Sequence, residues 1–185
     1  NSSIEREWLN KLALHTQIVL KKSEINYEHG KILYALLSDY IKKNNERNKE
    51  FTIFETGTAR GFSSLCLSKA INDNNCIGSI FTLDILPNLK KRYWNVIDDI
   101  DGKKTRLELL SKWPDELKNI NFISGNINNT LKKINFERIH FAFIDSLHTK
   151  KQIKKEFNFV SHRQNTGDLI VLDDIDTTPK KNNWD

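Results

Sequence analysis

Short apolar stretches alternate with longer amphipathic ones along most of the chain. Five stretches rich in Ile, Phe, Val and Leu predict β-strands. We expect these strands at residues 51–55, 79–84, 120–124, 139–144 and 168–173. Apolar residues at helical spacing predict helices between and after them. These helices are expected at about residues 62–71, 88–99, 105–118, 127–134 and 149–162.

This alternation predicts βαβ units and therefore an α/β fold with a doubly wound, mostly parallel sheet. Near-continuous apolarity in the fourth and fifth predicted strands suits strands that are buried on both faces. Such sheets bind ligands at the carboxyl ends of their strands, beside the point where the strand order reverses. The residues that directly follow each predicted strand are therefore the candidates for function.

Two amphipathic helices are expected before the first strand, at residues 4–21 and 27–43. We therefore expect an N-terminal helical extension over residues 1–48 and a sheet domain over residues 49–185. The two helices either cover a substrate pocket or form the face of a homodimer, and the pattern does not decide between these roles.

The composition is that of a folded domain, with 38% hydrophobic and 29% charged residues. No apolar run approaches the roughly 18 residues of a membrane span, and residues 1–8 do not resemble a signal peptide. We therefore expect a cytoplasmic protein with no membrane partner. Cys66 and Cys76 lack metal-ligand spacing and are predicted to be reduced thiols, with Cys66 in the core. The net charge is +5, but the lysines are scattered, so nucleic acid is not an expected partner.

The first predicted strand runs into the loop ETGTARGFS at residues 55–63. Gly57 can take a positive φ, and Gly61 lets the next helix begin close to a ligand. The spacing G-x-x-x-G lacks the middle glycine of dinucleotide-binding loops, and no Gly-Lys-Ser/Thr of a Walker loop follows. Glu55 would repel a diphosphate and suits a cationic ligand.

E-x-G-x-x-x-G at the end of a first strand resembles the first motif of class I S-adenosylmethionine (SAM)-dependent methyltransferases. The resemblance extends over roughly residues 50–176 and implies a Rossmann-like fold with SAM as the cofactor. It also implies that the loop holds the methionine part of SAM. The residues that match this role are Glu55, Gly57, Thr58, Gly61 and Ser63.

Polar residues also end the second and third predicted strands. The carboxylate of Asp84 can accept hydrogen bonds from two ribose hydroxyls, and the family carries an acid there for the SAM ribose. The alternative for Asp84 is a solvated strand end or a helix cap. Asn126 matches a family position near the adenine, where Asp is more common. A simple turn or N-cap accounts for Asn126 as well.

Acidic residues follow the fourth and fifth predicted strands, namely Asp145 and then Asp173 and Asp174. Grouped like charges cost free energy unless a cation binds, and a hard divalent ion prefers oxygen ligands. The pattern resembles the metal-assisted O-methyltransferase branch, which includes enzymes of the sugar, natural-product and catechol type. That resemblance implies that these three carboxylates bind Mg²⁺ or another divalent cation.

The same resemblance makes His148 and Asp145 the candidate catalytic residues, with His148 as the base and Asp145 also beside the cofactor. Other interpretations stay open: Asp145 as a helix cap, His148 as a surface histidine, and Asp173 as a metal-free contact to ligand. His140 alternates out of phase with its apolar neighbours, and we interpret it as structural.

The leading hypothesis is an O-methyltransferase that acts on a small hydroxylated molecule. A nucleic-acid methyltransferase is one alternative, although the Asn/Asp-Pro-Pro-Tyr/Phe motif of many such enzymes is absent. A non-catalytic SAM-binding or interaction module is another, and a nicotinamide dehydrogenase has the wrong glycine pattern. The family usually adds a sixth strand, a helix and an antiparallel seventh strand, but no such β-hairpin pattern follows Asp174. The chain also lacks Met, so we expect either that the protein continues or that residues are missing from this sequence.

Overall fold

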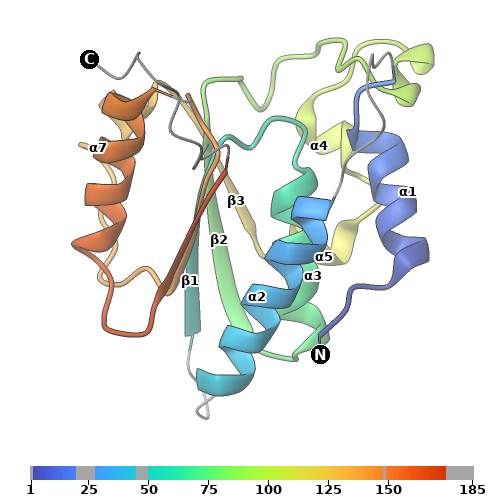
Figure 1. The fold of residues 1–185 in the computed structure, drawn as a ribbon. Helices are drawn as coiled ribbons and strands as arrows, with labels where there is room; N and C mark the ends of the chain where they lie inside the picture. Colours follow the sequence, from blue (N-terminus) through green and yellow to red (C-terminus); the bar gives the residue numbers. More distant parts are fainter. Residues whose placement is uncertain (1, 20–27, 45–49, 148, 174–185) are drawn as a thin grey trace, which may run out of the picture.

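A computed structural model describes residues 2–19, 28–44, 50–147 and 149–173 (Figure 1). Five strands form one sheet in the order β3-β2-β1-β4-β5, and every neighbouring pair is parallel. The strands are β1 (Glu50–Thr56), β2 (Ile77–Asp84), β3 (Ile120–Ser124), β4 (Phe141–Ile144) and β5 (Leu169–Leu172). The strand order reverses between β1 and β4, where a ligand crevice is expected. The predicted α/β fold with a parallel, doubly wound sheet is confirmed.

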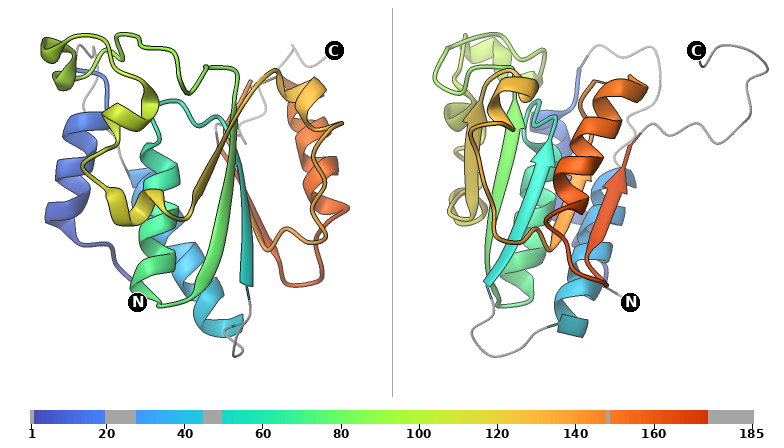
Figure 2. Two further views of the ribbon diagram at one scale, coloured as in Figure 1. Left: turned by 180° about the vertical axis from the view of Figure 1, so that it is seen from behind. Right: turned by 90° about the vertical axis from the view of Figure 1, so that its left-hand side faces the viewer.

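Helices cover both faces of this sheet. They are α1 (Arg6–Thr16), α2 (Glu28–Asn44), α3 (Phe62–Asp73), the 3₁₀ helix η1 (Ile97–Asp101), α4 (Arg106–Leu109), α5 (Pro114–Leu117), α6 (Ile127–Thr130) and α7 (Lys150–Ser161). Helix α7 lies on one side of the sheet, and α1, α2 and α3 lie on the other (Figures 1 and 2). None of these described helices has the length and hydropathy of a membrane span.

Alternation along β1 sends successive side chains to two separate cores. Phe51 and Ile53 belong to the larger core, which includes residues of α1, α2 and α3. Phe54 belongs to a smaller core under α7, together with Val160. Cys66 is buried in the larger core and, as predicted, is a free thiol. The two cores hold the sheet between its helical layers, so the strand ends keep fixed relative positions.

The N-terminal helices are layers of the larger core. Leu9 and Leu12 of α1, and Leu33 and Leu37 of α2, are buried in the same cluster as the sheet residues. Gly30 brings α2 against α3, since a Cβ at that position would lie 2.7 Å from the Phe62 ring. Helix α2 therefore begins close to the first turn of α3.

Two predicted helices between β2 and β3 are wrong in part. The stretch expected as a helix at 88–99 is mostly irregular and joins η1 only at its end, because Arg92 and Lys104 exchange backbone hydrogen bonds of 3.0 Å and Trp94 is buried. The helix expected at 105–118 is broken into α4 and α5. Pro114, which has no N–H for a helical hydrogen bond, occupies the first turn of α5. The helix expected at 127–134 is only the short α6.

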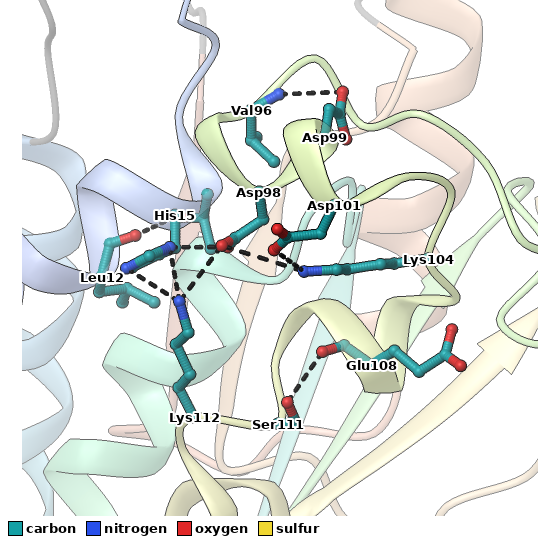
Figure 3. A network of polar contacts seen from close by, with 11 residues as sticks. Leu12, His15, Val96, Asp98, Asp99, Asp101, Lys104, Glu108, Ser111 and Lys112 are labelled. Atoms are coloured by element: carbon teal, nitrogen blue, oxygen red, sulfur yellow. Dashed lines mark hydrogen bonds and ion pairs between the residues drawn. The ribbon is translucent and has the colours of Figure 1, made fainter.

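A polar network joins α1 to the segment between β2 and β3 (Figure 3). The Asp98 carboxylate lies 2.6 Å from His15 Nδ1 and 3.2 Å from Lys112 Nζ, and its side chain is only 9% exposed. Lys104 approaches the same carboxylate at 4.0 Å. Burial by itself would raise the pKa of Asp98. Hydrogen bonds and charges from His15 and Lys112 together have the larger effect, so the net pKa is lowered. Asp98 therefore anchors the end of α1.

We predict that Asp98→Asn lowers the free energy of unfolding by about 1–3 kcal/mol at neutral pH, because it weakens a mostly buried charge-assisted network. The folded pKa of Asp98 is lowered, so its stabilisation is present above the unfolded pKa of roughly 3.9 and is lost as the pH falls through the folded value. Urea unfolding of both proteins at several pH values measures this difference.

Asp101→Asn is the matched control, because the Asp101 side chain is 64% exposed and pairs with Lys104 at the edge of the same network. An exposed pair of this kind contributes about 0–1 kcal/mol. Equal losses in the two variants, or a difference that does not shrink in acid, would contradict the prediction.

Candidate functional site

The loop after β1 is shaped by two glycines in the left-handed region. Gly57 has φ +90°, and its N–H donates to the Leu83 carbonyl of β2 at 2.9 Å. A Cβ on Gly57 would lie 1.7 Å from the Asp145 carbonyl oxygen, so no other residue fits without moving the backbone. Gly61 has φ +87° and is the N-cap of α3. The loop therefore passes close to the ends of both β2 and β4.

Glu55 lies beneath this loop on the α3 side of the sheet and is completely buried. Its Oε2 accepts hydrogen bonds from the hydroxyls of Ser64 and, at 2.5 Å, of Thr82. Its Oε1 has no hydrogen-bond partner among the described residues. Burial raises the pKa of Glu55. The hydroxyls of Ser63, Ser64 and Thr82 and the positive charge of Arg106 act to lower the pKa, but burial is the larger effect. Glu55 is thus a buried carboxyl group behind the loop, and its burial disfavours the charged form.

Asp84 holds the loop from the end of β2. One carboxylate oxygen accepts a hydrogen bond from the Ala59 N–H at 2.5 Å, and the other accepts one from the Leu86 N–H at 2.8 Å. Ala59 itself has φ +45°, a conformation that costs a non-glycine residue free energy. The hydrogen bond from its N–H helps to hold this conformation.

Arg106 of α4 is fully buried between Asp84 and the loop. Its Nε donates to the Ala59 carbonyl at 3.0 Å, and Nη2 lies 3.3 Å from the Asp84 carboxylate. Its guanidinium stacks between Trp94 and Phe122, at 5.6 and 5.7 Å from the ring centroids. Sequence reasoning missed Arg106, although an arginine directly after the capping Thr105 was visible.

A cavity of about 490 Å³ opens at the carboxyl ends of β1, β2, β3 and β4. This volume is within the range of about 300–1,000 Å³ of small-molecule sites. The cavity has Gly57 and Asp84 on one side and Asp145 on the other. Its other lining residues are mostly apolar or small: Ala59, Leu83, Ile85, Gly125, Asn126, Ile127, Ser146 and Leu147.

A second cavity of about 130 Å³ lies beside the same loop and shares Gly57, Ala59 and Asp145 with the first. Most of its lining residues are polar, and the lining includes four predicted site residues, Gly57, Thr58, Ser63 and Asp145. The N-terminal segment supplies four more wall residues: Thr16 at the end of α1, Gln17 and Ile18 directly after it, and His29 of α2. Arg60 and Phe62 complete the lining.

A family model described as a methyltransferase domain matches residues 54–175. The chain belongs to this methyltransferase family. The match contains the glycine loop, Asp84 and Asp145, which are among the residues that line the cavities. The resemblance to class I SAM-dependent methyltransferases is therefore confirmed for the family and the fold.

Solved structures share the methyltransferase fold at low sequence identity. Cofactor-bound Rv0187 from MTB is 18% identical with a TM-score of 0.59, over 91% of this chain and 65% of that one. The SAH-bound methyltransferase PaMTH1 of Podospora anserina is 16% identical with a TM-score of 0.58, over 94% and 64%. The O-methyltransferase NovP is 11% identical with a TM-score of 0.59, over 83% and 67%. This chain therefore spans about two thirds of the length of these structures. No curated protein matches it.

The predicted SAM residues of this methyltransferase domain lie in different positions relative to the cavities. Gly57, Asp84 and Asn126 line the larger cavity. Asn126 also caps α6, since its side chain accepts a hydrogen bond from the Asn128 N–H at 3.0 Å. Glu55 and Gly61 line neither cavity. Their contacts with SAM stay predictions.

The predicted metal ligands lie on one edge of the methyltransferase sheet as far as the structure describes them. Asp145 and Asp173 follow Ile144 and Leu172, which are paired residues of the parallel strands β4 and β5. Asp174 and His148 lie outside the described residues. Within the described part of the chain, no group of three or more His, Cys, Asp or Glu side chains could hold a metal ion. The metal site therefore stays a prediction.

Glu156 of α7 links the ends of β1 and β4 through hydrogen bonds, one of them from Ser146, the residue after Asp145. This fully buried carboxylate accepts hydrogen bonds from Thr56 Oγ1 at 2.6 Å, Ser146 Oγ at 2.5 Å and Gln152 Nε2 at 2.6 Å. Sequence reasoning missed Glu156. Its spacing of four residues from both Gln152 and Val160, on the buried face of α7, was the available signal.

His140 has the structural role that its position predicted. It is 7% exposed and precedes β4, at the opposite end of the strand from Asp145. Its Nδ1 accepts a hydrogen bond from the Thr52 N–H at 3.0 Å, and its ring packs edge-on against Phe51. His140 therefore stabilises the amino end of the sheet.

We predict that Gly57→Ala destabilises the protein by clearly more than Gly102→Ala. Both glycines have a positive φ, +90° and +97°, but a Cβ on Gly102 would meet no atom within 4 Å. Gly102→Ala thus reports the conformational cost alone, about 1–2 kcal/mol. Gly57→Ala adds the clash with the Asp145 carbonyl. Urea unfolding of the two variants tests this, and equal losses would show that the close approach of the loop to β4 is wrong.

Proposed function

We propose that this chain binds SAM across the two cavities and transfers its methyl group to a hydroxyl of a small molecule with help from a divalent cation. The observation that carries the proposal is the position of the glycine loop. It lies between a mostly apolar cavity next to Asp84 and a polar cavity next to Ser63, and the two cavities share three residues. SAM has one nucleoside end and one zwitterionic amino acid end, which suit these two environments.

The larger cavity suits the nucleoside. Asp84 lies at its wall, where a carboxylate can accept hydrogen bonds from ribose hydroxyls. Ile85 and Leu147 also line it, although they are 70% and 66% exposed. Large apolar side chains that remain exposed around a cavity favour a flat apolar ligand that would cover them. An adenine base has this property.

The buried carboxyl group of Glu55 beneath the loop suits the cationic part of SAM. Glu55 Oε1 lacks a hydrogen-bond partner among the described residues, and a buried carboxylate oxygen of this kind favours a nearby positive charge. Asp145 borders both cavities. Neither acid would favour a diphosphate in the loop, which supports SAM rather than a nicotinamide dinucleotide.

The carboxyl ends of β4 and β5 suit a divalent cation and an acceptor hydroxyl. Asp145 and Asp173 provide two oxygen donors on neighbouring strands, and Asp174 and His148 remain the further predicted ligand and base. A bound divalent cation would lower the pKa of an acceptor hydroxyl that it contacts. One protein of similar fold, NovP, is an O-methyltransferase, which agrees with a hydroxyl acceptor.

We predict that the chain binds S-adenosylhomocysteine (SAH) with a micromolar Kd, roughly −8 kcal/mol, and that Asp84→Asn weakens this binding about tenfold. The substitution removes the charge that strengthens the hydrogen bonds of ribose hydroxyls. Isothermal titration calorimetry measures both values. NAD serves as the competing ligand and is expected not to bind.

Asp115→Asn is the matched control for Asp84→Asn, because Asp115 is a surface residue of α5 that pairs with Lys118 and lines neither cavity. It should leave the Kd unchanged. Absence of SAH binding by the wild-type chain would end the methyltransferase proposal, and an unchanged Kd in Asp84→Asn would remove Asp84 from the ribose site.

We predict that the chain binds Mn²⁺, used as a paramagnetic probe for Mg²⁺, and that Asp145→Asn and Asp173→Asn each abolish saturable binding. Each substitution removes one charged oxygen ligand. Electron paramagnetic resonance counts the free Mn²⁺ directly and needs no knowledge of the acceptor. Retained binding in both variants would place the cation elsewhere.

Turnover with a panel of catechols and hydroxylated sugars tests the remaining part of the proposal. Methyl transfer should stop in excess EDTA and return with Mg²⁺. Full activity in EDTA would contradict metal assistance. SAH binding without transfer to any acceptor would favour the non-catalytic module instead.

A further inference from the structure

We propose that the N-terminal helices complete the cofactor site and that His29, on the first turn of α2, binds the carboxylate of the methionine part of SAM. This inference rests on the proposed function and assigns a ligand contact to a segment outside the matched residues 54–175. It concerns the smaller cavity, of which His29 is a lining residue.

The size and chemistry of the smaller cavity identify which end of SAM it receives. Its 130 Å³ cannot hold a nucleoside, whereas the neighbouring 490 Å³ can. Since both cavities share Gly57, Ala59 and Asp145, a ligand whose ribose lies near Asp84 can extend past the loop into the smaller cavity. The end that enters there is the amino acid.

The lining of the smaller cavity separates the two charges of that amino acid. Asp145 is the carboxylate on its wall and suits the ammonium group. His29 and Arg60 carry N–H donors on the wall and suit the carboxylate. The first turn of α3 lies beside them, and Gly61, its N-cap, offers no side chain to that turn. A helix N-terminus favours a negative charge, so it supports the same orientation.

The position of His29 is set by close packing between α2 and α3. Gly30 has no Cβ, and this allows the start of α2 to approach Phe62, which is also a wall of the cavity. The imidazole of His29 then lies 4.9 Å from the Phe62 ring, between centroids, and is half-buried. Contact with the Phe62 ring restricts the imidazole to the cavity wall.

The end of α1 forms the remaining wall and is held independently of a ligand. Thr16, Gln17 and Ile18 line the cavity directly after His15, which binds Asp98 (Figure 3). The Val19 N–H also donates to the Asn95 carbonyl at 3.1 Å. The wall that the N-terminal helices contribute is therefore preorganised, which lowers the entropic cost of binding.

The test compares SAH with decarboxylated SAH, which keeps the amine and the nucleoside but lacks the carboxylate. Calorimetry gives the Kd of each ligand for the wild type and for His29→Phe, which retains an aromatic ring against Phe62 but has no N–H. We expect the wild type to prefer SAH. His29→Phe should raise the Kd of SAH about ten- to a hundredfold and leave that of decarboxylated SAH unchanged, because one charge-assisted hydrogen bond is lost.

Two further variants keep the test decisive. His29→Gln restores a side-chain N–H and should recover most of the SAH affinity. His162→Phe makes the same replacement at a histidine of another cavity, next to α7, and should change neither Kd. Thermal unfolding of each variant verifies that it is folded.

An unchanged SAH affinity in His29→Phe, or equal weakening of both ligands, would overturn the role of His29 while leaving SAM binding intact. Failure of His29→Gln to recover affinity would also overturn it. A wild type that binds neither ligand would overturn this inference together with the proposed function, so the two failures are distinguishable.

Discussion

The arrangement of the site depends on one buried cation, the guanidinium of Arg106. Two carboxylates, Glu55 and Asp84, lie under or beside the glycine loop with little access to solvent. Burial of like charges would be strongly unfavourable without a compensating cation. Arg106 supplies it from α4, contacts Asp84 at 3.3 Å and donates to the Ala59 carbonyl of the loop. The loop, the end of β2 and the segment before β3 are thereby joined through a single side chain.

This constraint explains why the segment between β2 and β3 departs from simple helix. The guanidinium must be covered on both faces, and Trp94 and Phe122 provide those faces. Trp94 reaches Arg106 from an irregular stretch, in which its Nε1 donates to the Lys104 carbonyl at 2.8 Å. The same stretch leads into η1, whose Asp98 anchors α1. The segment that covers Arg106 below the loop is therefore the same segment that positions α1 at the wall of the smaller cavity.

On the opposite side of the crevice, a buried carboxyl group with three hydrogen bonds joins the strand ends. Glu156 accepts hydrogen bonds from Thr56 of β1 and from Ser146 after β4, so it holds the two strands between which the topology reverses. Asp145 lies between these two strand ends and borders both cavities. Polar groups that are fully hydrogen-bonded in this way fix side-chain positions more narrowly than apolar packing does. In the proposed reaction, this matters because methyl transfer requires the acceptor and the sulfonium to be aligned.

Sequence alone determined the order of the strands along the chain, their parallel arrangement and the edge of the sheet at which the larger cavity opens. Apolar periodicity and the loop from Glu55 to Ser63 depend on neighbouring residues, so they can be read from the chain directly. The loop motif and Asp84 were identified in this way, and both lie within the residues that the family model matches. The acids after β4 and β5 were also evident, although their metal role remains a prediction.

Tertiary structure decided what depends on contacts between distant residues. Arg106 and Glu156 lie 47 and 100 positions from the loop and strand residues that they bind, and no local pattern marks a buried ion with such partners. The conformation of residues 88–99 follows from pairing with Lys104 and from the burial of Trp94, which outweigh helical periodicity. The inclusion of His29 in a cavity wall depends on the approach of Gly30 to Phe62 across two helices. Local propensity sets the elements, but charge compensation and close packing select which of their side chains reach the site.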